Sequence, residues 1–163
     1  MWLYRKKTRD GEERVVDGES EQSELFAMKE IERKEEEKWI QREINILSEV
    51  NHPNIVALKE VYEEKEKVTL VMEYCRGGDL FDNLRKFGSK DMNISLIMSN
   101  LISSVMFLHD RDTVHRDLKL DNFVFDSEDI KSATIRPKLI DFGFAKNLKG
   151  TEGNKGDRGA LRK

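Results

Sequence analysis

The stretch "HRDLKLDN", which runs from His115 to Asn122, gathers three kinds of polar group within a few residues. Asp117 supplies a carboxylate, Lys119 an ammonium and Asn122 a carboxamide. Transfer of a phosphoryl group needs a base or orienter for the attacking hydroxyl, a cation that stabilises the moving charge, and oxygen ligands for a metal ion. The spacing of these residues suits metal-assisted phosphoryl transfer.

A second acidic loop, "DFG", begins at Asp141. Two short apolar runs precede it, "NFVF" (122–125) and "PKLI" (137–140), and they flank a polar loop, as the strands of a hairpin do. Pairing of these runs would bring Asn122 and Asp141 to neighbouring strand ends. Because amide and carboxylate oxygens suit Mg²⁺, the hairpin predicts a magnesium site there, in one cleft with Asp117.

Strand patterns dominate the first half of the chain. "LFAMKEI" (25–31) predicts a strand, and the β-rich runs at 55–62 and 67–74, separated by "EEKEK", predict an antiparallel hairpin. A helix is expected between the first strand and the hairpin, over 32–50. Its apolar positions share one face: Ile40, Ile44 and Leu47.

Helix patterns dominate the part that follows. "GGD" at 77–79 interrupts the strand pattern, Asp79 can cap a short helix, and an amphipathic helix is expected from Asn93 to His109. That helix is too short and too polar to span a bilayer. Because strands come first and helices second, the sequence predicts an α+β protein with segregated parts.

The composition narrows the classes of function. The 163 residues include 37% apolar and 37% charged residues with a formal net charge of −3, so the basic field that attracts nucleic acid is missing. Cys75 is the only cysteine, which excludes an intramolecular disulfide and a cysteine-rich zinc site. The N-terminal "MWLYRKKTRD" lacks the apolar run of a signal peptide, so a cytoplasmic, intracellular location without a membrane span is expected.

Three motifs follow one another along the chain: "FAMK" (26–29), "HRDLKLDN" and "DFG". In this order and spacing they resemble the signature set of the eukaryotic-type protein kinases, over residues 25–146. Lys119 in "HRDLK" resembles the serine/threonine type, and "HPNIV", "GGDLF" and "DFGFAK" resemble the calcium/calmodulin-dependent branch. The resemblance implies a kinase-like two-lobed fold, with an antiparallel sheet and a C-helix in the small lobe and an incomplete, mainly helical large lobe.

The resemblance also implies roles for the residues that match the motifs. Lys29 would bind the α- and β-phosphates of ATP, and Glu43 would pair with it from the C-helix. A solvated charge on the helix surface is the alternative for Glu43. Asp117 would be the catalytic base, and Lys119 would stabilise the phosphoryl group. Two residues would be the metal ligands: Asn122 and Asp141.

Further positions match the nucleotide-binding side of the family. Met72 would take the gatekeeper position, Glu73 and Cys75 would offer backbone groups to adenine, and Val124 would be a further ATP-binding residue. Asp79 would reach the ribose, with the cap of a helix as its alternative. His115 and Phe142 match the internal hydrophobic spine, so His115 is expected to be packed and not to bind a metal.

The chain departs from the family pattern on both sides of these motifs. Ahead of Lys29 the family carries a glycine-rich loop, G-x-G-x-x-G, that covers the phosphates, whereas this chain has only Gly11 and Gly18 there. After "DFG", no "APE" motif and no further large-lobe helices are found before Lys163. A truncated kinase with weak activity or none is therefore expected.

Four segments are predicted: a variable N-terminal segment with a degenerate glycine-rich loop (1–24), the small lobe (25–74), a partial large lobe (75–146) and a flexible tail (147–163). The expected function is that of a serine/threonine protein kinase, with ATP and Mg²⁺, acting on Ser/Thr hydroxyls of a protein substrate. The alternative is a pseudokinase or a kinase-like regulatory module that binds a protein partner without turnover.

Overall fold

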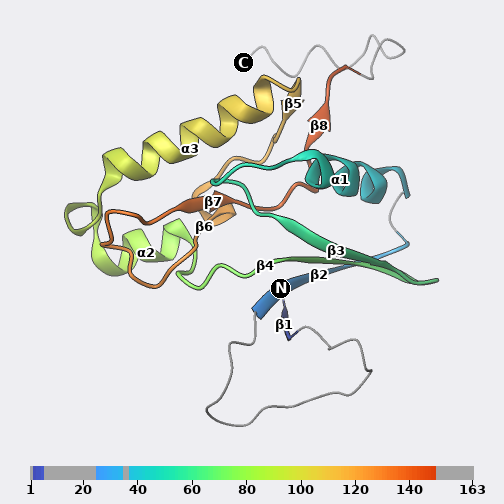
Figure 1. Cartoon of the computed structure of the whole chain (residues 1–163), viewed down its shortest axis with the longest axis horizontal. Helices are drawn as coiled ribbons and strands as arrows, with labels where there is room; N and C mark the ends of the chain where they lie inside the picture. The colour runs from blue at the N-terminus through green and yellow to red at the C-terminus, as the bar shows by residue number, and fades with distance from the viewer. Residues whose placement is uncertain (1, 6–24, 35–36, 150–163) are drawn as a thin grey trace.

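The computed structural model describes residues 2–5, 25–34 and 37–149, and the structural statements below concern these residues. The first part of the described chain holds a four-stranded sheet with one helix, and the second part holds two further α-helices and short strand pairs (Figure 1), which confirms the predicted α+β class. The elements are β1 (Trp2–Arg5), β2 (Leu25–Glu32), α1 (Glu37–Glu49), β3 (Leu58–Glu63), β4 (Lys67–Glu73), α2 (Leu80–Phe87), η1 (Ser89–Asp91), α3 (Ile94–His109), β5 (Thr113–Val114), η2 (Leu120–Asn122), β6 (Phe123–Phe125), β7 (Pro137–Leu139) and β8 (Lys146–Asn147).

A four-stranded antiparallel sheet has the order β1-β2-β4-β3. β4 lies in its interior and carries a continuous buried run over 68–72, as expected for a strand that is covered on both faces. β3 lies at an edge, and none of its residues is fully buried. α1 lies over the sheet (Figure 1), and its residues Ile40, Ile46 and Leu47 enter the core.

α1 begins at Glu37 and not at Glu32, where the sequence pattern placed its start. The reason is that β2 continues through Glu32, which pairs with Lys67 of β4. The backbone N–H of Arg33 then donates to the carbonyl of Glu66 at 2.8 Å and turns the chain away from the sheet. Pairing with the sheet thus outweighs the local preference of this charged run for a helix.

Side-chain caps begin both α-helices of the second part, α2 and α3. The carboxylate of Asp79 accepts a hydrogen bond from the backbone N–H of Asp82 at 2.8 Å, at the start of α2. The amide oxygen of Asn93 accepts one from the backbone N–H of Leu96 at 3.1 Å, at the start of α3. Each cap satisfies an N–H that lacks a partner within the helix. Among the described helices, none has both the length and the apolar character that a bilayer crossing requires.

The "GGD" turn passes close to β6. The N–H of Gly77 donates to the Phe125 carbonyl at 2.9 Å, and the N–H of Phe125 donates to the Gly78 carbonyl at 2.9 Å. A Cβ at Gly77 would lie only 2.1 Å from the carbonyl oxygen of Ser127, so no side chain fits there. Gly78 has a φ of 71°, which glycine adopts without strain. The turn therefore holds β6, and with it Val124, beside the segment that leaves β4.

Short antiparallel ladders pair β6 with β7 and β5 with β8. β7 also contacts the segment ahead of β3, because the N–H of Leu139 donates to the Asn54 carbonyl at 2.9 Å and the N–H of Val56 donates to the Leu139 carbonyl at 3.0 Å. These bonds join the sheet to the helical part, and one core continues through both. Its most buried members include Leu70, Phe125, Leu139 and Phe142.

Two expectations fall mainly outside the described residues. Of the N-terminal segment 1–24, only β1 is described, and the predicted degenerate glycine-rich loop with Gly11 and Gly18 lies outside. Of the predicted tail over 147–163, Asn147 belongs to β8 and pairs with Thr113, and residues 150–163 lie outside. The ladder with β5 thus extends the folded part slightly past the expected boundary.

Candidate active site

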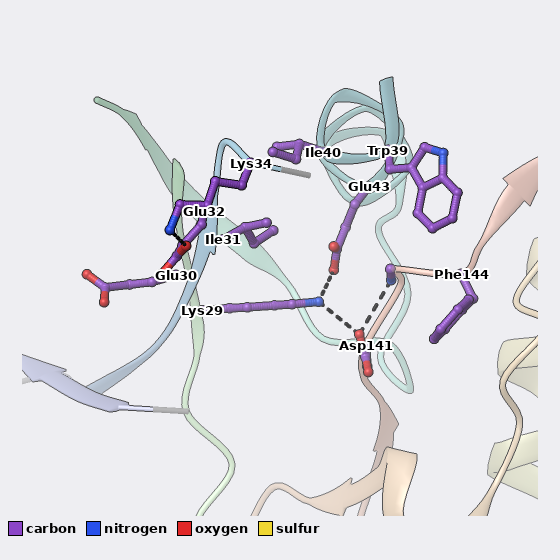
Figure 2. Close-up of a pocket in the computed structure, with 11 residues that line it drawn as sticks. Lys29, Glu30, Ile31, Glu32, Lys34, Trp39, Ile40, Glu43, Asp141 and Phe144 are labelled. Carbon is purple, nitrogen blue, oxygen red and sulfur yellow. Dashed lines mark hydrogen bonds and ion pairs between the residues drawn. The ribbon is translucent and has the colours of Figure 1, made fainter. Parts of the chain in front are cut away.

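Lys29, Glu43 and Asp141 form an ion-pair cluster where β2, α1 and the loop after β7 meet (Figure 2). The Nζ of Lys29 lies 2.7 Å from Oε1 of Glu43 and 2.8 Å from Oδ1 of Asp141. The side chain of Glu43 is only 5% exposed, whereas those of Lys29 and Asp141 are 32% and 39% exposed. Burial of Glu43 does not fit the alternative of a solvated surface charge. The cluster therefore presents a fixed ammonium and a fixed carboxylate to the pocket beside it.

The charges of this cluster sustain one another. Burial lowers the pKa of Lys29, but the charge of Glu43 and the hydrogen bond to Asp141 outweigh burial and hold that pKa above its ordinary value. Burial raises the pKa of Asp141, but the hydrogen bond and charge of Lys29 outweigh it and hold that pKa below its ordinary value. Lys29 and Asp141 are therefore both charged at neutral pH. An ammonium has three N–H donors, so one more remains for an anion after two carboxylates are bound.

Two residues of the neighbouring loops have a left-handed backbone. Asp141 has a φ of 60° and Arg116 a φ of 68°. Such conformations cost on the order of 1–3 kcal/mol for residues other than glycine and cluster at functional sites. Contacts support both turns: Oδ1 of Asp141 accepts from the N–H of Gly143 at 3.4 Å, and Nε of Arg116 donates to the Phe144 carbonyl at 2.7 Å.

The three polar residues of the "HRDLKLDN" loop contact one another. The Nζ of Lys119 lies 2.8 Å from Oδ2 of Asp117, and Nδ2 of Asn122 donates to the same oxygen at 2.8 Å. The hydrogen bonds from Lys119 and then from Asn122 hold the pKa of Asp117 below its ordinary value, so Asp117 is a charged carboxylate at neutral pH. The apolar run after Asn122 predicted that this residue begins a strand. In the structure Asn122 ends η2, and the strand begins at Phe123.

His115 is packed beneath this loop. Its side chain is enclosed, with the whole residue 3% exposed, and its ring meets the edge of Phe142 at a centroid distance of 4.9 Å. The Ile140 carbonyl, 3.0 Å from Nε2, can only accept, and Nδ1 accepts from the N–H of Asp117 at 3.4 Å, so the ring is the neutral Nε2–H tautomer. Burial lowers the pKa of His115, in agreement with this neutral state. His115 thus connects the two loops through hydrogen bonds to Asp117 and Ile140.

A pocket of about 330 Å³ lies between the sheet and β6–β7. It brings together most of the residues predicted for the site: Lys29, Glu43, Met72, Glu73, Cys75, Asn122, Val124 and Asp141. Burial and then the charge of Glu73 raise the pKa of Cys75 to about 12, so this thiol stays neutral in the pocket wall. Asp117 and Lys119 do not line the pocket, but Asp117 adjoins it through its hydrogen bond with Asn122.

Asp79 and Glu73 use their carboxylates within the fold. The Asp79 carboxylate caps α2 and does not line the pocket, which agrees with the alternative given for it, a helix cap. The carboxylate of Glu73 accepts hydrogen bonds from the N–H of Ala57 at 2.7 Å and from Nζ of Lys138 at 2.8 Å. The Glu73 carboxylate is thus occupied by Ala57 and Lys138, and the backbone of Glu73 remains as the group that could contact a ligand.

Sequence reasoning missed five residues of this pocket wall: Ala27, Met28, Glu30, Val56 and Ile140. Ala27 is two residues before Lys29, and the period of two along a strand places both on one face, so this residue could have been found. Val56 and Ile140 enter through the contact between β7 and the segment ahead of β3, which no local pattern reveals. Met28 also lines the pocket although it precedes Lys29 directly.

A second cavity, of about 820 Å³, shares the ion-pair cluster with the first pocket (Figure 2). Lys29, Glu43 and Asp141 form part of its wall, together with the exposed rings of Trp39 and Phe144. The cluster thus borders two hollows, and the smaller one collects the predicted nucleotide-binding residues.

Asn122 and Asp141 are the two residues expected to bind a metal ion here. No group of three His, Cys, Asp or Glu side chains that could hold a metal is found within residues 2–5, 25–34 and 37–149. Asn122 and Asp141 line one pocket, and this donor set of one amide and one carboxylate fits Mg²⁺ that shares its shell with phosphates and water. The residues present therefore fit a magnesium ion that arrives with a nucleotide.

Comparison with known proteins adds a family to this geometry. Residues 14–159 match the family model described as protein kinase domain. The chain is 40% identical over 134 residues to the human serine/threonine-protein kinase DCLK3, which covers 78% of this chain and 20% of that protein. It is 41% identical over 105 residues to calcium-dependent protein kinase 3 of Plasmodium yoelii yoelii, covering 64% of this chain and 19% of that protein.

A third relative is myosin light chain kinase A of Dictyostelium discoideum, 38% identical over 135 residues, which cover 79% of this chain and 45% of that protein. The chain thus spans from about a fifth to under half of the length of these relatives. The family model matches most of the chain, and the motifs occur in the family's order around one pocket. The chain belongs to the protein kinase domain family.

Proposed function

We propose that the chain binds ATP with Mg²⁺ in the pocket between the sheet and β6–β7 and transfers the γ-phosphoryl group to a Ser/Thr hydroxyl of a protein. One observation carries the proposal: the ammonium of Lys29 is fixed between Glu43 and Asp141 in the pocket that Asn122 also lines, with Asp117 bonded to Asn122. A cation, two oxygen ligands and a charged carboxylate are the groups that this reaction requires.

The apolar end of the pocket suits adenine. Ala27, Val56, Met72 and Val124 supply buried apolar walls, and a pocket of about 330 Å³ is of the size that small ligands occupy. The backbone of Glu73 and Cys75 at this end would supply the polar contacts that orient the base. The phosphates would then lie toward Lys29 and Asn122, with the ribose between them and the base.

The polar end suits a triphosphate. Lys29 would bind the α- and β-phosphates with its remaining N–H donor, and Asp141 and Asn122 would hold Mg²⁺. When bound, the metal would neutralise phosphate charge. The pKa of Asp141, held low by Lys29, keeps this ligand ionised at neutral pH.

Asp117 would act on the attacking hydroxyl. Its charged carboxylate can accept the hydroxyl proton while the oxygen bonds to the γ-phosphorus and the bond from that phosphorus to the departing ADP oxygen breaks. Lys119, at 2.8 Å from Asp117, would stabilise the charge on the transferring group. Turnover by the 163-residue chain is expected to be slow, because the sequence ahead of Lys29 has glycines only at 11 and 18 and lacks the phosphate-covering motif.

The experiment is a pair of measurements on the purified chain: calorimetric binding of MgATP, and transfer of radiolabel from ATP to a mixture of Ser- and Thr-containing peptides. We expect magnesium-dependent binding in the wild type and in Asp117→Asn, and slow transfer that Asp117→Asn abolishes. Asp121→Asn, the same change at an exposed residue of the same loop, should retain transfer.

Absence of magnesium-dependent ATP binding at millimolar nucleotide would overturn the proposal. Binding without any transfer would instead support the alternative, a kinase-like binding module without turnover. Transfer that survives Asp117→Asn would remove the role assigned to that carboxylate.

A further inference from the structure

An ion pair between the predicted site residue Glu73 and a lysine outside the predicted set, Lys138, connects the end of β4 to β7. Oε1 of Glu73 lies 2.8 Å from Nζ of Lys138, and the same oxygen accepts from the N–H of Ala57 at 2.7 Å. The Lys138 side chain is 12% exposed and that of Glu73 is 26% exposed. Three chain segments far apart in sequence therefore meet at one carboxylate oxygen.

Each of these segments contributes to the nucleotide pocket. Glu73 itself lines the pocket at the apolar end, and Val56, next to Ala57, lines it as well. Lys138 pairs in register with Val124 across the β6–β7 ladder, and Val124 is a wall residue too. The ion pair therefore lies directly behind the wall that would contact adenine.

Backbone hydrogen bonds make the β7 side of this arrangement rigid. Before Lys138, the side-chain amide of Asn54 donates to the Pro137 carbonyl at 3.0 Å, and after it the backbone of Leu139 bonds to the backbone of Asn54 and Val56. On the β4 side, the N–H of Glu73 donates to the Ala57 carbonyl at 3.0 Å. The Lys138 ammonium thus connects two ladders. The β2–β4 ladder ends at Glu73, on the adenine side of the pocket, and the β6–β7 ladder is followed by Asp141.

Burial gives this pair a larger effect than the exposed pairs of the same protein. Removal of one partner from a largely desolvated pair leaves the other charge without compensation and forces local rearrangement. The segment most able to rearrange is the one that follows β4, because it leaves the sheet at Glu73. Loss of the pair should therefore move the backbone of Glu73 and Cys75, while Lys29 and Asp141 keep their own ion pair.

We propose that Lys138 is a positioning residue that acts through the carboxylate of Glu73 and sets the affinity of the pocket for the adenine half of ATP, not for its phosphates. The inference rests on the proposed function, since it assigns the apolar end of the pocket to adenine. Lys138 does not line the pocket itself.

The test compares two ligands, MgATP and magnesium tripolyphosphate, which lacks adenosine. In Lys138→Met and in Glu73→Gln, we expect the affinity for MgATP to fall about tenfold, because a charge left without its partner displaces the backbone groups that would contact adenine, and the affinity for tripolyphosphate to stay within about twofold. The double variant should be no weaker than either single variant, because both remove one interaction. Lys138→Arg should restore most of the MgATP affinity.

A matched control is Lys149→Met, which makes the same change at an exposed ion pair with Asp112 and should leave both affinities unchanged. Equal losses for MgATP and tripolyphosphate in Lys138→Met, or no loss for either, would overturn the inference.

A second readout separates this inference from the proposed function. Amide hydrogen exchange of the free protein should become faster at residues 73–76 in Lys138→Met and not in Lys149→Met. If the wild type binds no MgATP, the proposed function fails, and with it the adenine assignment. Unchanged exchange at 73–76 would overturn the positioning role itself.

Discussion

Two clusters, each of one cation and two carboxylates, connect α1 to the chain segment 29–33, and they differ in burial. Lys29 lies between Glu43 and Asp141, and Arg33 lies between Glu37 and Glu63. The distances are nearly equal, with 2.7 Å for Lys29 to Glu43 and 2.7 Å for each carboxylate of the Arg33 cluster. Distance therefore does not tell the two clusters apart.

The exposure of their carboxylates to solvent distinguishes the two clusters. The Glu43 side chain is 5% exposed, whereas those of Glu37 and Glu63 are 58% and 55% exposed. Exposed pairs gain little because water and salt screen them and long side chains lose entropy, but a buried carboxylate without its cation is costly. Loss of the Arg33 cluster should thus change the stability of the fold only slightly, whereas loss of the Lys29 cluster should disrupt the site.

The largest effect is expected for Lys29→Met. This change removes the ammonium that would bind the phosphates, so the affinity for MgATP should fall by at least about tenfold, as loss of a charge-assisted contact does. Arg33→Met should leave that affinity unchanged. Isothermal calorimetry on both variants checks this, and equal affinities would show that the two clusters do not differ as argued.

A smaller effect is expected for Glu43→Gln, in the stability of the fold. The neutral amide leaves Lys29 with Asp141 alone in a partly buried place, which should lower the free energy of unfolding by about 1–2 kcal/mol. Urea unfolding monitored by fluorescence measures this change. Glu37→Gln is the matched substitution at the exposed cluster, and a loss as large as that of Glu43→Gln would contradict the role of burial.

Acid should weaken the Lys29 cluster in a defined range of pH. The pKa of Asp141 is lowered by Lys29 from an ordinary value of 3.8, so its contribution to stability is complete above that value and is lost as the pH falls through the lower, folded-state pKa. In Asp141→Asn the decline of the unfolding midpoint below about pH 4 should be less steep than in the wild type. Identical acid profiles would mean that Asp141 gains nothing from Lys29.

The smallest effect is expected for Arg33→Met. Its unfolding midpoint should drop slightly at low ionic strength, and the difference from the wild type should vanish in about 1 M salt, where screening acts over about 3 Å. Thermal unfolding in both buffers checks this. A difference that persists in high salt would place Arg33 with the buried cluster.

The residues of the Lys29 cluster were predicted from the resemblance to the kinase motifs, and helix periodicity was not used for them. The structure adds the physical reason for the burial of Glu43, which follows Ile40 by three positions and precedes Leu47 by four and so lies on the apolar face of the helix. The cap at Asp79 was readable because a cap is a local interaction between residues two or three apart.

Long-range pairing explains what the sequence did not predict. The partners Glu73 and Lys138 are 65 positions apart, and a lysine in a three-residue strand has the pattern of a solvated side chain. The start of α1 was wrong because the pairing of Glu32 with Lys67 depends on a strand far along the chain. Contacts of this kind are decided by the packing of whole elements and not by any local pattern.

The close packing of two backbone segments at Gly77 limits which substitutions this position can accept during evolution. With a Cβ placed 2.1 Å from the Ser127 carbonyl oxygen, even alanine would require the loop after β6 to take another path. A lineage that retains this crossing cannot exchange Gly77 by a single substitution, although the residue has no reactive group. An invariant position can therefore record where two chain segments cross, and invariance there would be a poor guide to chemistry.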